Sequence, residues 1–250
     1  MNDPHSIPAI STIPVALLAG GMAARLGVIA QQTPKALVDV NGRAFIDHQL
    51  GLLHRYGVRR VVLCLGHLGG KIEEHLGDGS RIGMSLRYSH DGARLVGTGG
   101  AVRRALPMLG ELFWVMYGDS YMDIDYAEVL RRFCSSQSPR AARGLMTLIR
   151  NENRWDKSNA IFQNGRLTCY DKRNRSEQMQ YIDYGIQLLR REAFDTTPAG
   201  GAFDLADLYR DLVTRGEMIG HEVFNRFYEI GTPQSLEETR RYLQSASRVA

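Results

Sequence analysis

A glycine turn followed by two cations is the part of the chain best suited to chemistry. The turn, Leu18-Ala19-Gly20-Gly21, follows an apolar run over residues 13–19 that is typical of a buried strand. Glycines let the backbone turn tightly and bring its N–H groups close to an anion. Arg25 and Lys35 place positive charge within reach of the same turn. The pattern predicts a polyphosphate site, in which these two cations take part in the chemistry.

The scarcity of lysine supports this interpretation of Lys35. Only four of the 31 basic residues are lysine. A lysine ammonium is a compact point charge that suits a phosphoryl group, whereas arginine offers a planar fork. Lys35 follows Pro34 in a segment expected to return to the glycine turn. We expect Lys71 and Lys157 to be ordinary surface charges.

A carboxylate is expected on the same rim. The apolar run over residues 112–117 ends at Gly118-Asp119, so Asp119 stands at the carboxyl end of a predicted buried strand. There it could hold Mg²⁺ against phosphate oxygens, which are the hard ligands this ion prefers. The alternative is that Asp119 caps a turn. Asp123 and Asp125 are expected to cap the following helix.

Other glycines and acids also occur at predicted loop positions. The segment Gly97-Thr98-Gly99-Gly100-Ala101 opens a predicted helix and would permit close approach of a flat or phosphorylated ligand. Three further segments lie at the ends of predicted strands: Asp171-Lys172, Asp183-Tyr184-Gly185 and Glu229-Ile230-Gly231. Taken singly, each of these patterns is more typical of a turn than of a site.

The elements that must position these residues alternate between strand and helix. The first half predicts strands at 13–19, 60–65, 85–89 and 112–117, with helices at 45–56, 70–76, 98–106 and 126–133. This rhythm predicts an α/β fold, a doubly wound, mostly parallel, Rossmann-like sheet that binds ligands at the carboxyl ends of its strands. The second half predicts strands at 144–149, 160–162, 167–170, 182–190, 219–224 and 227–229, a turn at Asn164-Gly165, and helices at 204–215, begun by Asp204, and 233–243. We expect one domain, residues 1–250, with a nucleotide-binding part at about 13–135 and an inserted β-rich substrate lobe at about 140–243.

Bulk properties narrow the function. The net charge is only +4 and the arginines are scattered, which disfavours a nucleic-acid partner. Three widely spaced cysteines form no metal pattern and suggest a reducing compartment, and the first apolar run is too short for a signal or membrane helix. We expect a cytoplasmic protein without a membrane partner, and leave open whether it forms a homo-oligomer. The absence of G-x-G-x-x-G after the first strand disfavours a nicotinamide-dependent oxidoreductase.

Six motifs occur in a specific order from about residue 14 to residue 243. The motif L-A-G-G-x-G-x-R-L followed by P-K-x-L matches residues 18–26 and 34–37. A central glycine loop matches 97–101, G-D matches 118–119, and an acid-lysine pair matches 171–172. Asn-x-Gly corresponds to 183–185, and Asp-x-Gly-Thr-Pro to 229–233. In this the chain resembles the sugar-phosphate nucleotidylyltransferases, which make a nucleoside-diphosphate sugar and pyrophosphate from an NTP and a sugar 1-phosphate (EC 2.7.7 type).

The resemblance implies a role for each motif. Backbone N–H groups at Gly20 and Gly21 would hold the triphosphate together with Arg25, and Lys35 would lie near the α-phosphate. Mg²⁺ would be held by Asp119 and Glu229. Further nucleotide contacts would come from Leu18, Ala19, Thr98, Gly99, Gly100 and Gly118. The sugar phosphate would be bound by Lys172, with Asp171, Asp183 and Gly185 around the sugar.

Three residues depart from the family pattern: Ala23 replaces a loop glycine, Asp183 an asparagine, and Glu229 an aspartate. The short chain is most similar to the heptose 1-phosphate guanylyltransferase branch. This similarity predicts guanylyl transfer to D-glycero-D-manno-heptose 1-phosphate, for surface polysaccharide precursors. Uridylyl, cytidylyl or thymidylyl transfer to another sugar 1-phosphate, and a non-catalytic regulatory protein on the same fold, remain alternatives.

Overall fold

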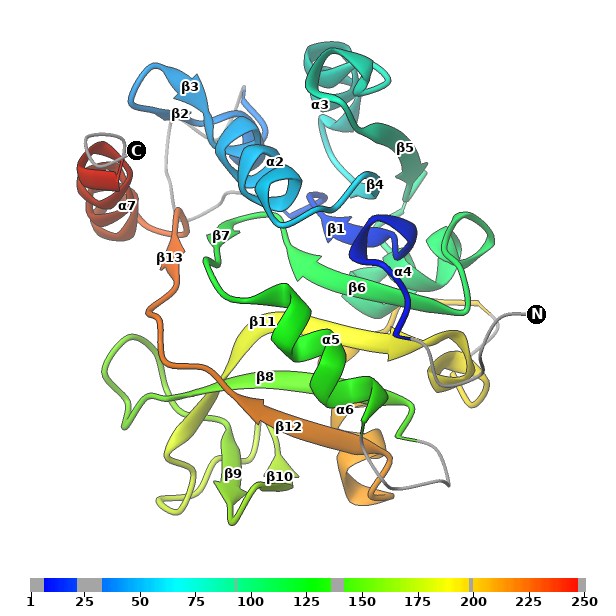
Figure 1. Ribbon diagram of the computed structural model, residues 1–250, viewed down its shortest axis with the longest axis vertical. Helices are drawn as coiled ribbons and strands as arrows, with labels where there is room; N and C mark the ends of the chain where they lie inside the picture. Colours follow the sequence, from blue (N-terminus) through cyan, green and yellow to red (C-terminus); the bar gives the residue numbers. More distant parts are fainter. Residues whose placement is uncertain (1–6, 22–32, 93, 136–141, 198–199, 247–250) are drawn as a thin grey trace.

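A nine-stranded mixed sheet runs through the molecule (Figure 1). The structure, a computed structural model, describes residues 7–21, 33–92, 94–135, 142–197 and 200–246. Strand β1 (Val15–Leu18) pairs in parallel with β4 (Arg60–Leu65) on one side and β6 (Leu112–Tyr117) on the other, and β5 (Ser85–His90) extends the parallel set. The predicted doubly wound α/β sheet is confirmed.

The second half of the chain continues this sheet with mixed pairing. Strand β11 (Tyr181–Arg190) runs antiparallel to β6 and to β8 (Gly144–Arg150), and β12 (Met218–Glu222) runs parallel to β8. The hairpin of β9 (Ala160–Gln163) and β10 (Arg166–Tyr170) joins at β11. Its turn, Asn164-Gly165, has positive φ at both residues, as the Asn-Gly signal predicts.

Alternate side chains of the parallel strands face opposite layers of helices. Val15 and Leu17 pack with α2 (Phe45–Arg55), α3 (Gly69–Leu76) and α5 (Tyr126–Cys134). Ala16 packs on the other face with α4 (Gly97–Ala105) and α6 (Leu205–Thr214). In Figure 1, α5 lies across the near face of β11 and β8. A strand that is buried on both faces appears in the sequence as a continuous apolar run. The ends of these strands therefore lie close to the predicted ends.

Two short strand pairs lie beside the main sheet. Strands β2 (Asp39–Val40) and β3 (Arg43–Ala44) form a hairpin, and β7 (Ser120–Tyr121) pairs with β13 (Tyr228–Glu229), which is the strand predicted at 227–229. The other three strands were not predicted, because two residues are too few to show a period. Helix α7 (Pro233–Ala246) packs on β13 beside the hairpin. Among the described residues, short 3₁₀ helices lie at Ile10–Thr12, Lys35–Leu37, Ser80–Ile82, Leu106–Met108 and Arg191–Phe194.

Two of the three aspartates that the sequence places at helix starts are caps in the structure. The Asp204 carboxylate accepts from the Ala206 N–H at the start of α6, and the Asp125 carboxylate accepts from the Glu128 N–H at the start of α5. Asp123 was expected to cap the same helix, but its carboxylate accepts from the Tyr56 hydroxyl at 2.6 Å. None of the helices in the described ranges combines the length and apolar character needed to cross a bilayer.

Three strands end close together because glycines stand at their carboxyl ends. A Cβ on Gly20 would lie 2.7 Å from the Gly66 nitrogen, just beyond β4. A Cβ on Gly118 would lie 2.7 Å from the Leu18 carbonyl oxygen. The absent side chains let the ends of β1, β4 and β6 meet, and this edge carries the predicted site.

The glycines of α4 serve the packing of a different segment. A Cβ on Gly99 would lie 2.2 Å from the Phe203 ring. The N–H groups of Gly99 and Gly100 both point at the Phe203 carbonyl oxygen, at 2.9 and 3.4 Å. Small residues in this turn therefore let the chain before α6 lie against α4.

We expect Gly99→Ala to lower the free energy of unfolding by about 1–3 kcal/mol, because the new methyl overpacks against Phe203. Gly51 in α2 is the matched control, since a Cβ there would meet nothing within 4 Å. Gly51→Ala should raise stability by up to about 1 kcal/mol through helix propensity. Urea denaturation measures both, and equal effects of the two substitutions would contradict this account of Gly99.

Candidate active site

Two cavities meet at the carboxyl end of β6. The first, here the β1 cavity, has a volume of about 370 Å³ and is lined by Leu18, Ala19, Gly20, Gly21, Lys35, Gly97, Thr98, Gly118 and others. The second, here the Lys172 cavity, has a volume of about 520 Å³ and is lined by Lys172, Asp183, Gly185, Glu229 and others. Tyr117 and Asp119 line both.

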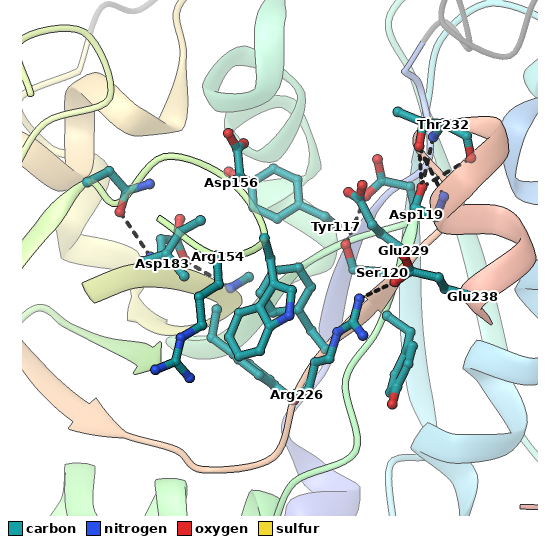
Figure 2. A pocket seen from close by; sticks show the side chains of 18 of the residues that line it. Tyr117, Asp119, Ser120, Arg154, Asp156, Asp183, Arg226, Glu229, Thr232 and Glu238 are labelled. Carbon is teal, nitrogen blue, oxygen red and sulfur yellow. Dashed lines mark hydrogen bonds and ion pairs between the residues drawn. The ribbon is translucent and has the colours of Figure 1, made fainter. Parts of the chain in front are cut away.

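Backbone pairing brings Asp119 and Glu229 together from distant parts of the chain. Glu229 lies opposite Ser120 in the β13–β7 pair, and the Ile230 N–H donates to the Asp119 carbonyl at 3.0 Å. Figure 2 shows Asp119 and Glu229 beside each other at one end of the Lys172 cavity, with Asp183 and Arg154 at the other. The site therefore has two adjacent carboxylates, as the motifs implied.

Lys35 lies at the junction of the two cavities. Its Nζ is 2.6 Å from Asp119 Oδ2, and only 13 % of its side chain is exposed. The lysine stands at the start of a 3₁₀ turn after Pro34, and this turn directs the side chain back to the end of β6. The Ser120 hydroxyl donates to the other Asp119 oxygen at 3.1 Å. Lys35 thus reaches the predicted site and pairs with its carboxylate.

Lys172 presents a fixed positive charge in the second cavity. Its Nζ donates to the Tyr117 hydroxyl at 3.5 Å and lies 3.7 Å from Asp183 Oδ2. Burial alone would lower the pKa of Lys172, but Tyr117 and Asp183 raise it by more, so the net direction is upward. Burial raises the pKa of Tyr117 to about 12. The ammonium stays protonated at neutral pH and is suited to hold an anion.

Asp183 lies beneath Lys172 rather than at the open surface of the cavity. Its side chain is 2 % exposed. Oδ1 accepts from the Gly185 N–H at 2.9 Å and the Gln187 amide at 2.5 Å, and Oδ2 accepts from the Tyr170 hydroxyl at 3.4 Å. Burial raises the pKa of Asp183 and the Lys172 charge opposes that shift. This geometry favours the positioning of Lys172 over the expected contact with sugar hydroxyls.

Asp171 requires a correction. It is not among the residues that line either cavity. Its Oδ1 accepts from the N–H groups of Arg173 and Asn174 at 2.7 and 2.9 Å, and hydrogen bonds of this kind lower the pKa of the carboxyl. The carboxylate therefore anchors the turn after β10, while its neighbour Lys172 points into the cavity.

Gly99 and Gly100 also require a correction. They are buried against Phe203 and do not line the β1 cavity, whereas Gly97 and Thr98 do. The Thr98 hydroxyl donates to Asp204 and accepts from the Leu205 N–H, both at 2.9 Å, which ties α4 to α6. A glycine-rich helix start predicts that another group approaches the backbone closely, but not which group. At the start of α4 that group is the backbone of Phe203. Arg25 and Ala23 lie outside the described residues.

Sequence reasoning missed several residues of the Lys172 cavity. Tyr117 precedes Gly118-Asp119 directly, so its place at the strand end was a usable signal. Arg226 stacks on Trp155 and Tyr228, with its guanidinium carbon 5.6 and 4.9 Å from the ring centroids, and pairs with Glu238. These contacts join segments far apart in the chain, and no local pattern indicates them.

Comparison with known proteins assigns the chain to a family. The model of the family described as "Nucleotidyl transferase" matches residues 15–245. The chain belongs to the nucleotidyl transferase family. This confirms the family and the enzyme class that the sequence motifs predicted. The junction of the two cavities is this nucleotidyltransferase's candidate active site.

Named relatives are sugar-phosphate nucleotidylyltransferases. The chain is 28 % identical to the N-acetylmuramate alpha-1-phosphate uridylyltransferase of Neisseria meningitidis serogroup B, over 90 % of this chain and 95 % of the relative. It is 29 % identical to the D-glycero-alpha-D-manno-heptose 1-phosphate guanylyltransferase of Campylobacter jejuni, over 45 % of this chain and 50 % of the relative. The structure of HddC from Yersinia pseudotuberculosis complexed with GMP-PN superposes with a TM-score of 0.75 at 20 % identity, over 93 % of this chain and all of that one. This last likeness shows the fold.

We expect Asp183→Asn to lower the pKa of Lys172, because the substitution removes a negative charge that favours the ammonium. The KM for the sugar phosphate should then begin to rise at a lower pH than in the wild type, by about one unit for each 1.4 kcal/mol of lost interaction. A pH series of KM measures this shift. Asp171→Asn is the matched control and should leave the KM profile unchanged; a shift of equal size there would contradict the separation of the two roles.

Proposed function

We propose that the chain transfers a nucleotidyl group from an NTP in the β1 cavity to a sugar 1-phosphate in the Lys172 cavity. The observation that carries this proposal is the junction of the two cavities at Asp119 and Tyr117, with Lys35 beside it. Two substrates held in adjoining cavities can react within one site, which converts a bimolecular encounter into a positioned step.

The reaction needs alignment more than proton transfer. An oxygen of the sugar phosphate attacks the α-phosphorus of the NTP, the bond to the β-phosphate oxygen breaks, and pyrophosphate leaves on the opposite side. The nucleophile is already an anion, so no general base is required. Lys172 would hold the sugar phosphate, and Lys35 would exchange Asp119 for the α-phosphate. The glycine turn at Gly20 and Gly21 would accept the triphosphate, and Arg25 would face the departing pyrophosphate.

Mg²⁺ is the proposed cofactor, and the donors at the junction fit it. Asp119, in the turn before β7, and Glu229, on the neighbouring β13, offer hard oxygen ligands. No group of three or more metal-binding side chains occurs among the residues that the structure describes. Two carboxylates suit an ion that completes its shell with substrate phosphates and water. When bound, the ion would neutralise charge on the reacting phosphates.

For the acceptor we propose N-acetylmuramate 1-phosphate, with UTP as donor. Arg175 lines the Lys172 cavity, and its Nε donates to the Lys172 carbonyl at 3.0 Å. The other cavity arginines, Arg154 and Arg226, pair with Glu152 and Glu238, whereas in the described part of the chain Arg175 has no carboxylate within ion-pairing distance. An acceptor with a second anionic group, the lactyl carboxylate, would complement it. The near full-length match to the N-acetylmuramate enzyme supports the same choice.

Guanylyl transfer to heptose 1-phosphate, which the sequence predicted, is the second candidate. The Campylobacter jejuni relative favours it, although that match spans only 45 % of this chain. Either product would serve cell-surface polysaccharides and would be made from cytoplasmic substrates.

We expect Asp119→Ala to lower kcat by about a hundredfold or more at saturating Mg²⁺, because a ligand that offsets phosphate charge is lost. Glu229→Gln should act similarly and weaken the Mg²⁺ dependence, since the amide keeps the shape and loses the charge. Glu229→Asp should remain substantially active. Steady-state kinetics across Mg²⁺ concentrations checks all three. Mild effects of both Glu229 variants with unchanged Mg²⁺ dependence would remove Glu229 from the metal site.

A substrate panel tests the function itself. Four NTPs are combined with N-acetylmuramate, N-acetylglucosamine, heptose and glucose 1-phosphates, and pyrophosphate release is measured. We expect the highest kcat/KM with UTP and N-acetylmuramate 1-phosphate. Preference for GTP and heptose 1-phosphate would establish the second candidate, and no release with any pair would refute the enzymatic proposal in favour of a regulatory protein.

A further inference from the structure

One side chain of α2 reaches the turn that carries Asp119. Gln49 is 1 % exposed and lies outside both cavities. Its Nε2 donates to the Tyr117 carbonyl at 2.9 Å and to the Ser120 carbonyl at 2.7 Å. These two carbonyls stand on either side of Gly118-Asp119. A single amide therefore bridges the two ends of the turn between β6 and β7.

Two backbone hydrogen bonds also restrain this turn. The Gly118 N–H donates to the Leu18 carbonyl at 2.9 Å, and the Asp119 carbonyl accepts from the Ile230 N–H at 3.0 Å. Strand β1 thus holds the turn from one side and β13 from another. Gln49 adds a restraint from the helix layer, and it spans the turn, whereas the contacts of Lys35 and the Ser120 hydroxyl fix the Asp119 side chain alone.

The Gln49 side chain is not the one that would maximise the stability of the fold at this position. Gln49 Oε1 is buried without a hydrogen-bond partner among the described residues. Burying an unpaired carbonyl oxygen is unfavourable, and an apolar side chain of similar size would avoid it. An apolar side chain could not donate to the Tyr117 and Ser120 carbonyls, so it would not hold the geometry of the turn.

We propose that Gln49 is a positioning residue that holds the Asp119 carboxylate at the junction of the two cavities. In this role it fixes the distance from Asp119 to Lys35 and to Glu229, and so sets how strongly the junction binds a divalent cation. The inference rests on the proposed function, because it assumes that Asp119 acts on the substrates through that cation.

The test uses Gln49→Leu, which removes both donated hydrogen bonds at similar volume, and Gln49→His, which keeps one ring N–H. The matched control is Thr147→Val. Thr147 is fully buried in the same sheet, and its hydroxyl donates to the Ile186 carbonyl at 2.7 Å, away from the turn. Each variant is assayed below its Tm for kcat, for both KM values and for the Mg²⁺ concentration at half-maximal rate. Mn²⁺ binding with a non-hydrolysable UTP analogue is measured by electron paramagnetic resonance.

For Gln49→Leu we expect kcat to fall about tenfold, with Mn²⁺ affinity lower by a similar factor and the KM for the sugar phosphate nearly unchanged. Gln49→His should be intermediate, and it decides the question if Gln49→Leu does not fold. Thr147→Val should lower the Tm without changing Mn²⁺ affinity.

Unchanged Mn²⁺ affinity in the folded Gln49 variants, or an equal loss in Thr147→Val, would overturn the inference and leave the proposed function standing. Wild-type protein that releases no pyrophosphate with any substrate pair would instead refute the proposed function.

Discussion

The confinement of one short turn is the constraint on which the rest of the site depends. Residues 118–119 lie where β1, β6 and β13 come together, and strand ends can meet there only because glycines leave room for backbone against backbone. The two cavities share their wall at this point, so a displacement of the turn would alter both. In a doubly wound sheet the carboxyl edge is where ligands bind, and here the β7–β13 pair is added at that edge.

Charge at this edge is organised around paired groups. Lys35 is held against Asp119 on one side of Tyr117, and Lys172 lies above Asp183 on the other. The second pair is supported by a buried network in which Gln187 donates to Asp183 and accepts from Tyr209. A buried carboxylate with several hydrogen bonds holds a neighbouring ammonium in place without being open to solvent. The difference in exposure between Asp119, at 35 %, and Asp183, at 2 %, suits one carboxylate to contact ligands and the other to position a lysine.

The C-terminal segment completes the site although it is distant in sequence. Arg226 lies between Trp155 and Tyr228, and Tyr228 stacks on Tyr242 of α7 at a centroid distance of 3.9 Å. These contacts tie the loop before β9 to the strand that carries Glu229. The Lys172 cavity is thus assembled from segments that are far apart in the chain, and their side chains give it charges of both signs.

Sequence patterns by themselves determined the main elements, the fold class and the edge of the sheet that carries the candidate site. Long apolar runs ending in glycine and acid, as at residues 112–119, signal a buried strand and its loop in one local pattern. The motif order likewise identified the family. Only the tertiary structure decided which motif residues line the two cavities. Gly99 and Gly100 approach the Phe203 backbone, Asp171 turns to its own loop, and Gln49 reaches across from another layer. The physical reason is that a residue type fixes what a group can bind, whereas its partner depends on packing between segments that sequence spacing does not encode.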